Sequence, residues 1–357
     1  MQSTRSWVDG LAAGRRARLI LLSVASLALG CDARQDFEQQ SYAFGTLVTL
    51  SVYDARRADY TAAMSELQAD YRRIDRDWYP WPKPDGGDPG ELMRINAALA
   101  DGQTIDVSPD LADLLRRAVE LEARTGGRFN PAIGRLTELW GFNELDRESW
   151  RPPPDSAIEA VMAERPSGMS LAWQADRLGS RSAAVMLDLG GIAKGALLDR
   201  SARILESHGI SNAVIDIGGD LLVLGVVHGR AARIGIRAPR EPGIVGWIEA
   251  APGEAVVSSG DYERFFEFEG RRYAHILDPS SGYPVSETAA VTVVHEDPEL
   301  ADAAATALVV AGAADFDQTC EQLGIKFALL IDSSGELRLT SGLARRVNWT
   351  RKQGLGT

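Results

Sequence analysis

Of all stretches in this 357-residue chain, residues Asp188 to Gly195 say most about the fold and the function that it can have. They read Asp-Leu-Gly-Gly-Ile-Ala-Lys-Gly. This stretch follows the apolar run 183–187, a predicted buried strand, and precedes a helical pattern over 192–208. A strand that turns through paired glycines into a helix gathers backbone amides at a helix N-terminus, which binds phosphate. Lys194 would add a positive charge. The alternative is an ordinary tight turn, since neither a Rossmann nor a P-loop pattern is present.

A second stretch, residues 297–308, predicts a helix that carries metal ligands. Asp297 is suited to cap this helix, Pro298 suits its first turn, and the alanine-rich run that follows is strongly helical. Asp302 and Thr306 are four residues apart and share one face, and their oxygens suit Mg²⁺. The alternative is local: the Thr306 hydroxyl bonds back to the Asp302 carbonyl, and Asp302 is merely solvated.

Five stretches carry motifs in a fixed order. They are Phe44-Gly45-Thr46, residues 126–131 leading to 139–142, Asp188 to Gly195, His275 to Pro279 with Ser281-Gly282, and Asp302 to Leu308. Together they resemble the ApbE family of FAD:protein FMN transferases. The resemblance implies an α+β fold of mixed, mostly antiparallel sheets flanked by helices, with the flavin site between two halves. It implies one domain over 41–345 and a C-terminal tail over 346–357.

The resemblance also implies a reaction and its catalytic groups. In the family, FMN moves from FAD to a threonine or serine hydroxyl of an acceptor protein through a phosphoester bond, and AMP is released. Gly191, Asp302 and Thr306 would hold Mg²⁺, and Lys194 would meet the pyrophosphate. His275 would take the proton of the acceptor hydroxyl, although a histidine at a strand end is more often structural on position alone. The expected catalytic residues are thus His275, Lys194 and Asp302.

Contacts to FAD follow from the same resemblance. They come from Phe44, Trp81, Arg128, Phe129, Asn130, Asp188, Lys194, Ile276 and Leu277. The family usually has methionine where Phe44 stands and aspartate where Asn130 stands. For Trp81, a place in the core or a surface-anchoring role is the alternative.

Two other functions stay open on the sequence. A Mg²⁺-dependent FAD pyrophosphatase would use the same residues with water as the nucleophile and give FMN and AMP. A non-catalytic flavin-binding lipoprotein would need no metal, and the pair Asp302 and Thr306 speaks against it. An acceptor that gains the mass of FMN distinguishes transfer from hydrolysis.

The first thirty residues have the three parts of a secretory signal. Three arginines within residues 15–18 precede an apolar run over 19–29, and small residues then precede Cys31. Residues 27–31 look like a bacterial lipobox, in which Cys31 is lipidated and becomes the mature N-terminus. The alternative is a cysteine that happens to follow a signal peptide. The predicted segments are a signal peptide over 1–30 and a tether over 31–40.

Asp32 resembles the signal that retains enteric lipoproteins at the inner membrane. The predicted location is therefore the periplasmic side of the bacterial inner membrane, with a lipid anchor at Cys31. The family's usual acceptors there are flavoprotein subunits of membrane redox complexes.

The chain is acidic, with a formal net charge of −12. Removing the first thirty residues, with four arginines and one aspartate, makes the charge more negative. Because nucleic-acid binding rests on neutralising phosphates, no nucleic-acid partner is expected. Cys320 is the only cysteine besides Cys31, so no disulfide is expected within the mature chain.

Periodicity predicts the remaining elements. Helical patterns cover 60–77 and 109–125, and a peripheral helix lies within 151–175. Strands are predicted at 42–53, 213–217, 221–226, 233–237, 244–250, 256–260, 265–268, 272–277 and 326–331. The first of these strands contains Phe44-Gly45-Thr46, and the chain beyond Leu343 is predicted to be poorly ordered.

Overall fold

The computed structural model describes residues 33–82, 86–144 and 150–350. The chain divides into two units, residues 1–33 and 34–357, and the second unit carries the fold. Within the described ranges, every helix is too short or too polar to span a bilayer. The predicted signal peptide and the lipidation of Cys31 lie outside the described residues.

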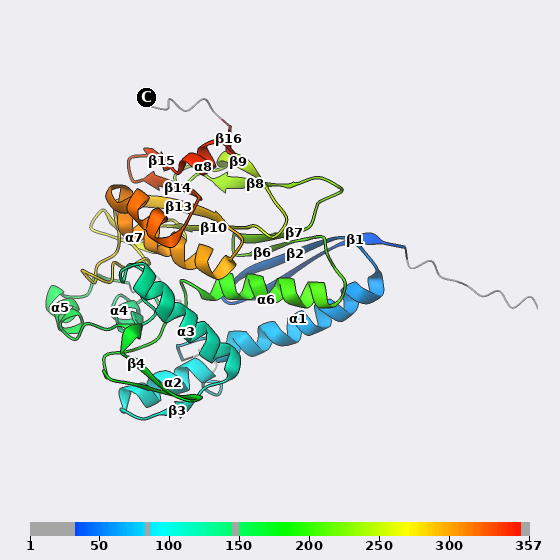
Figure 1. The fold of residues 1–357 in the computed structure, drawn as a ribbon. Coiled ribbons are helices and arrows are strands. Elements are labelled where there is room, and N and C mark those ends of the chain that lie inside the picture. The colour runs from blue at the N-terminus through cyan, green and yellow to red at the C-terminus, as the bar shows by residue number, and fades with distance from the viewer. Residues whose placement is uncertain (1–32, 83–85, 145–149, 351–357) are drawn as a thin grey trace, which may run out of the picture. The chain divides into compact units, whose positions relative to one another are not determined.

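An eight-stranded sheet forms the centre of the fold (Figure 1), and each neighbouring pair of strands is antiparallel. In spatial order the strands are β1 (Gln35–Ala43), β2 (Thr46–Ala55), β6 (Ala213–Ile217), β7 (Asp220–Leu224), β10 (Ala255–Gly260), β13 (Thr288–His295), β14 (Phe327–Asp332) and β15 (Leu337–Leu339).

Three long helices cover one face of this sheet: α1 (Arg57–Asp77), α6 (Ala193–Ser207) and α7 (Pro298–Leu323). Figure 1 shows α6 and α1 lying along the sheet, and α7 contacts β10, β13 and α6. Fully buried alanines at 301, 303, 304, 305 and 307 allow α7 to lie close to its neighbours. The main hydrophobic core lies between these helices and the sheet.

A small sheet covers the other face, and the second core lies beneath it. Its strands are β8 (Ala232–Arg237), β9 (Ile244–Ala250) and β16 (Asn348–Trp349), and helix α8 (Ser341–Ala344) contacts β14. The core there includes Val223, Ile248 and Val294, which are fully buried. Because β13 has one core on each face, it is buried from Thr288 to Val294 and lacks an alternating pattern.

The remaining elements are α2 (Glu91–Ala100), β3 (Ile105–Asp106), α3 (Pro109–Arg124), α4 (Gly134–Leu139), α5 (Asp155–Ala163), the 3-10 turn η1 (Gly168–Ser170), β4 (Leu171–Gln174), β5 (Arg177–Ser180), β11 (Phe265–Phe268) and β12 (Arg271–Ala274). Among them, α3 contacts α7 and α2 contacts α1. An aromatic cluster that includes Trp140, Phe142 and Phe266 packs α4 against the β11–β12 hairpin.

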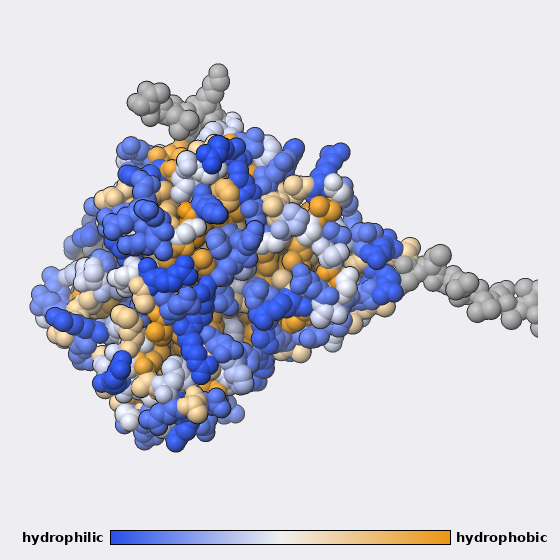
Figure 2. All heavy atoms as spheres, viewed as in Figure 1, coloured by the Kyte–Doolittle hydropathy of each residue, from blue (hydrophilic) through white to orange (hydrophobic). Residues whose placement is uncertain are grey.

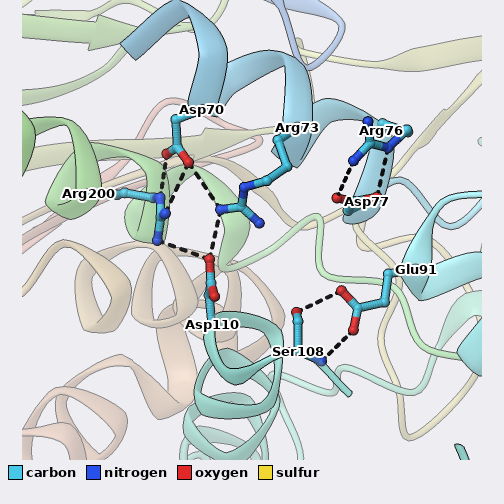
Figure 3. Close-up of polar contacts among 8 residues, drawn as sticks. All are labelled: Asp70, Arg73, Arg76, Asp77, Glu91, Ser108, Asp110 and Arg200. Carbon is cyan, nitrogen blue, oxygen red and sulfur yellow. Dashed lines mark hydrogen bonds and ion pairs between the residues drawn. The ribbon is translucent and has the colours of Figure 1, made fainter. Parts of the chain in front are cut away.

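Ion pairs join three helices that are far apart in the sequence (Figure 3). Arg73 of α1 contacts Asp70 at 3.0 Å and Asp110 of α3 at 2.7 Å, and Arg200 of α6 contacts both aspartates. Two arginines thereby share two carboxylates where α1, α3 and α6 meet.

On the face shown in Figure 2, hydrophilic side chains cover much of the helices, with hydrophobic residues grouped between them.

Most predicted elements are confirmed, and so is the α+β class with antiparallel sheets. The helix expected over 192–208 is α6, and the predicted strands 213–217, 244–250 and 265–268 match β6, β9 and β11. Asp297 caps α7 as expected, because its side chain accepts a hydrogen bond from the Leu300 amide at 3.0 Å.

The N-terminal predictions need correction. Residues 35–40, assigned to a tether, belong to β1, which pairs with β2 along its length. Phe44 and Gly45 are not inside a strand but form the two-residue turn of this hairpin, with φ of 57° and 71°. Such a turn requires positive φ at both positions, where phenylalanine is uncommon.

Two other predictions are also wrong. Residues 183–187 form no strand of a sheet: Met186 makes an isolated bridge to Ile133, and the side-chain amide of Asn96 bonds both backbone groups of Leu187. A side chain therefore replaces the neighbouring strand. The tail predicted from 346 begins with ordered residues, since β16 pairs with β9 and Arg346 contacts Glu254 at 2.6 Å.

Candidate active site

The glycine turn precedes α6 as predicted, and Asp188 shapes it. One carboxylate oxygen of Asp188 accepts a hydrogen bond from the Gly190 amide at 2.9 Å, and the other accepts one from the Thr137 hydroxyl at 3.0 Å. The half-buried carboxylate is thereby held at the start of the turn. Its contact with flavin stays a prediction.

Gly195 lets the first turns of α6 and α7 touch. A β-carbon added at Gly195 would lie 2.3 Å from the Pro298 carbonyl oxygen, so only glycine fits there. The Gly195 amide donates to the Asp302 carboxylate at 2.9 Å. The two motifs that the sequence separates by a hundred residues thus meet backbone to backbone.

Gly191, Asp302 and Thr306 converge at this contact. A β-carbon on Gly191 would lie 3.2 Å from the Thr306 hydroxyl oxygen and 3.2 Å from Cε2 of Phe129. Asp302 is 1% exposed. In the described part of the chain, no hydrogen bond joins the Thr306 hydroxyl to the Asp302 carbonyl, so the purely local alternative is not what the structure adopts.

The donor set at this contact fits Mg²⁺. A carboxylate, a hydroxyl and a backbone carbonyl are hard oxygen ligands. Burial and the neighbouring Asp220 charge raise the pKa of Asp302 above its usual value, although Lys194 opposes the shift. A bound cation would compensate a carboxylate so far from water. Across the described ranges, no three His, Cys, Asp or Glu side chains gather as metal ligands.

Lys194 has a partner that the sequence analysis missed. Its Nζ lies 2.6 Å from Oδ2 of Asp220, a carboxylate that is 1% exposed. Burial would lower the pKa of Lys194, but the charges of Asp220, Asp302 and Glu263 together outweigh burial and raise it. The lysine side chain as a whole is 31% exposed, so part of it reaches solvent. An aspartate directly after Gly218-Gly219 and before an apolar strand was the available signal.

His275 follows β12 and is neutral. Its backbone amide and its Nδ1 both contact the Arg264 carbonyl oxygen, at 3.0 Å and 3.1 Å. A carbonyl only accepts, so Nδ1 carries the proton and Nε2 keeps a lone pair. Burial and the charges of Arg264 and Lys194 lower the pKa of His275 to about 3. Nε2 is therefore the unprotonated, proton-accepting atom of the ring, and the low pKa makes it a weak base.

The predicted flavin contacts fall into two groups. Phe129 is buried beside Gly191, and Phe44 stands at the β1–β2 turn with its ring edge-on to Tyr71 at 5.5 Å. Ile276 and Leu277 are buried directly after His275. Their contacts with flavin stay predictions.

Two of the other three predicted contacts, Arg128 and Asn130, have internal partners. Arg128 pairs with Asp315 at 2.7 Å. The Asn130 amide donates to the Pro166 carbonyl at 2.9 Å and accepts from the Ala132 amide at 2.8 Å. Trp81 is buried and lines a small hollow with Tyr79 and Met93. Groups within the protein thus hold Arg128 and Asn130, and the flavin contacts of all three residues stay predictions.

Known proteins resemble the chain over most of its length. A curated protein of Rhodobacter capsulatus, named FAD:protein FMN transferase, is 38% identical over 94% of this chain, which spans 64% of that relative. A protein of the same name from Treponema pallidum is 31% identical, with 88% of this chain and 89% of the relative covered.

The fold has solved counterparts. The crystal structure of the ApbE protein from Thermotoga maritima superposes with a TM-score of 0.79 at 30% identity, covering 87% of this chain and 99% of that one. The family model described as "ApbE family" matches residues 44–329. The fold, the order of the motifs and this match together show that the chain belongs to the ApbE family.

Proposed function

We propose that the protein is an FAD:protein FMN transferase, which uses Mg²⁺ to move FMN from FAD to a threonine or serine hydroxyl of an acceptor protein. The observation that supports this best is the meeting of Gly191, Asp302 and Thr306 beside Lys194. The names of the two curated relatives agree with it.

The reaction is a displacement at phosphorus. The acceptor oxygen forms a bond to the FMN-side phosphorus, the bond to the bridging oxygen breaks, and AMP leaves with that oxygen. Nε2 of His275 takes the hydroxyl proton. Lys194 supplies an ammonium to the phosphate oxygens. Mg²⁺, held by Gly191, Asp302 and Thr306, would neutralise charge on the pyrophosphate.

Mass spectrometry tests the proposal. The protein is incubated with FAD, Mg²⁺ and a threonine-containing acceptor domain, and the acceptor should gain one FMN through a phosphoester while AMP appears. His275→Ala should abolish the gain and leave FAD affinity nearly unchanged. FMN and AMP without a labelled acceptor would point to a pyrophosphatase, and bound FAD that stays intact would point to a passive flavin-binding protein.

The acceptors that this proposal names are flavoprotein subunits of membrane redox complexes. A lipid anchor at Cys31 on the periplasmic side of the inner membrane would bring the enzyme to them. Pull-down of flavinylated proteins from membranes of the wild-type strain, compared with a strain lacking this protein, tests the choice of acceptor.

A further inference from the structure

Asp220 is a buried carboxylate whose two oxygens are both occupied. Oδ1 accepts a hydrogen bond from the Ser258 amide of β10 at 2.9 Å, and Oδ2 contacts Lys194 Nζ at 2.6 Å. The side chain is 1% exposed. A carboxylate that is held from two sides and closed to solvent has no path to a substrate.

The turn before β7 sets the place of this carboxylate. Gly218 and Gly219 have φ of 65° and 96°, and the Gly219 amide donates to Asp216 at 2.8 Å. A β-carbon on Gly218 would lie 2.6 Å from the Thr46 hydroxyl oxygen, so the turn packs against the start of β2. The sheet backbone therefore determines where Asp220 lies.

Among the described residues, Lys194 makes one ion pair, the one with Asp220, and the charges of Asp302 and Glu263 also act on it. Its ammonium carries three N–H donors, more than one contact uses. About a third of the side chain stays exposed, which a purely structural buried pair would not need. The donors that remain can meet ligand oxygens.

We infer that Asp220 is the positioning residue of Lys194, and that it acts on the reaction only by holding this ammonium in place. The inference rests on the proposed function, in which Lys194 meets the pyrophosphate. A long lysine side chain has much rotamer freedom, and fixing it beforehand favours the transition state. The loss of Asp220 should therefore lower the rate of transfer more than the affinity for FAD.

A double-mutant cycle tests this inference. Transfer rate and FAD affinity, from flavin fluorescence, are measured for the wild type, Asp220→Asn, Lys194→Met and the double variant. Asp220→Asn alone should lower the transfer rate by about 100-fold, with about threefold or less change in FAD affinity. In the Lys194→Met background, Asp220→Asn should change the rate by about twofold or less. If Asp220→Asn lowers the transfer rate as much in the Lys194→Met background as in the wild type, the inference is overturned, because Asp220 would then act without Lys194.

Two further variants keep the test decisive. Asp220→Glu retains the charge but moves the carboxylate, and it should also lose rate; full activity would show that position is unimportant. Glu254→Gln is the matched control, since Glu254 is a buried carboxylate paired with Arg346 at 2.6 Å, and its transfer rate should stay at the wild-type value. A wild-type protein that releases no AMP from FAD overturns the proposed function itself. If the wild type is active but the effects of the two substitutions simply add in the double variant, the inference alone is overturned.

Discussion

At the scale of single residues, the effect of Lys194 on the transfer rate should depend on where its ammonium lies as well as on its charge. Lys194→Met should lower the transfer rate more than FAD affinity, by a few kcal/mol (about 3) in transition-state stabilisation. Lys194→Arg should restore only part of the rate, since a planar guanidinium fork cannot take the place of a compact ammonium beside a tight glycine turn. Single-turnover kinetics and FAD titration measure both effects. Equal losses in rate and affinity would assign Lys194 to uniform substrate binding.

Asp302 and Thr306 supply the proposed metal ligands. Asp302→Ala should abolish turnover, and Thr306→Val, which keeps the shape but removes the oxygen, should raise the Mg²⁺ concentration needed for half-maximal activity. Thr319→Val is the control, because Thr319 is fully buried in the same helix and is not among the proposed ligands. Mg²⁺ titrations of all three variants check the assignment, which fails if the metal dependence is unchanged in Thr306→Val.

The relative placement of site residues could be predicted from the sequence where a single helix or turn carries them. Helical spacing alone places Asp302 and Thr306 on one face, whereas their role as metal ligands, with Gly191, was implied by the family resemblance and stays a prediction. Asp220 could not be predicted in this way. Its pairing with Lys194 depends on how β7 and α6 are placed in space, which no local pattern encodes.

At the scale of elements, the contact between α6 and α7 depends on residue 195 being a glycine, which has no β-carbon. Gly195→Ala should destabilise the fold by about 1–3 kcal/mol, because the new β-carbon would overlap the Pro298 carbonyl at 2.3 Å and force the helices apart. Urea unfolding measures the change. Gly190→Ala is the control, since its nearest neighbour is the Asp188 carboxylate at 3.2 Å. Wild-type stability in Gly195→Ala would contradict this packing.

Glu122 of α3 makes stability depend on pH. Its side chain is 1% exposed, and burial raises its pKa above 4.5 in the folded state. The folded state therefore binds the proton more tightly than the unfolded state. The contribution of Glu122 to the free energy of unfolding is full below about pH 4.5, and it is lost as pH rises through the folded pKa. Glu122→Gln should gain stability relative to wild type as pH rises from 4 to 7.

A neighbouring residue provides the control for Glu122. Glu120 lies on the same helix, and its hydrogen bond from Arg117 lowers its pKa. Glu120→Gln should therefore lose a little stability relative to wild type over the same pH range. Unfolding free energies at several pH values compare the two variants, and the same trend in both would refute the assignment to Glu122.

Strands were harder to predict than helices. The amphipathic faces of α1, α3 and α6 are visible in the sequence because one side of each meets the core. Strand β13 has a core on both sides and therefore lacks the alternation that identifies a strand. Strand β1 is polar on its exposed positions, and its pairing with β2 depends on a turn with phenylalanine in a left-handed conformation.

At the scale of the whole molecule, the proposed location depends on one thiol. Cys31→Ser should release the protein from the membrane, because acyl chains would be its anchor. Cys320→Ser is the control, since Cys320 is buried in α7, and this variant should remain in the membrane fraction. Fractionation followed by immunoblotting checks both. Cys31→Ser protein that resists carbonate extraction would refute the lipid anchor.

The class of the whole fold was accessible through the family resemblance, whereas its strand order was not. Antiparallel pairing between neighbours such as β6 and β7 follows from a short glycine turn. The pairing of β2 with β6, or of β7 with β10, joins segments separated by long stretches of chain. Such pairing is selected by packing of the complete core and not by either strand alone.

The pairing of β2 with β6 also dictates a sequence of events during biosynthesis. Val48, Leu50 and Val52 of β2 are buried in the finished sheet, yet their partner strand emerges only after α1 through α6 have been made. Until then the β1–β2 hairpin has an open edge, which is a hazard for aggregation. Synthesis that stops before Ala213 would leave a chain that cannot close its sheet, and such a fragment becomes a substrate for proteases and not a smaller version of the enzyme.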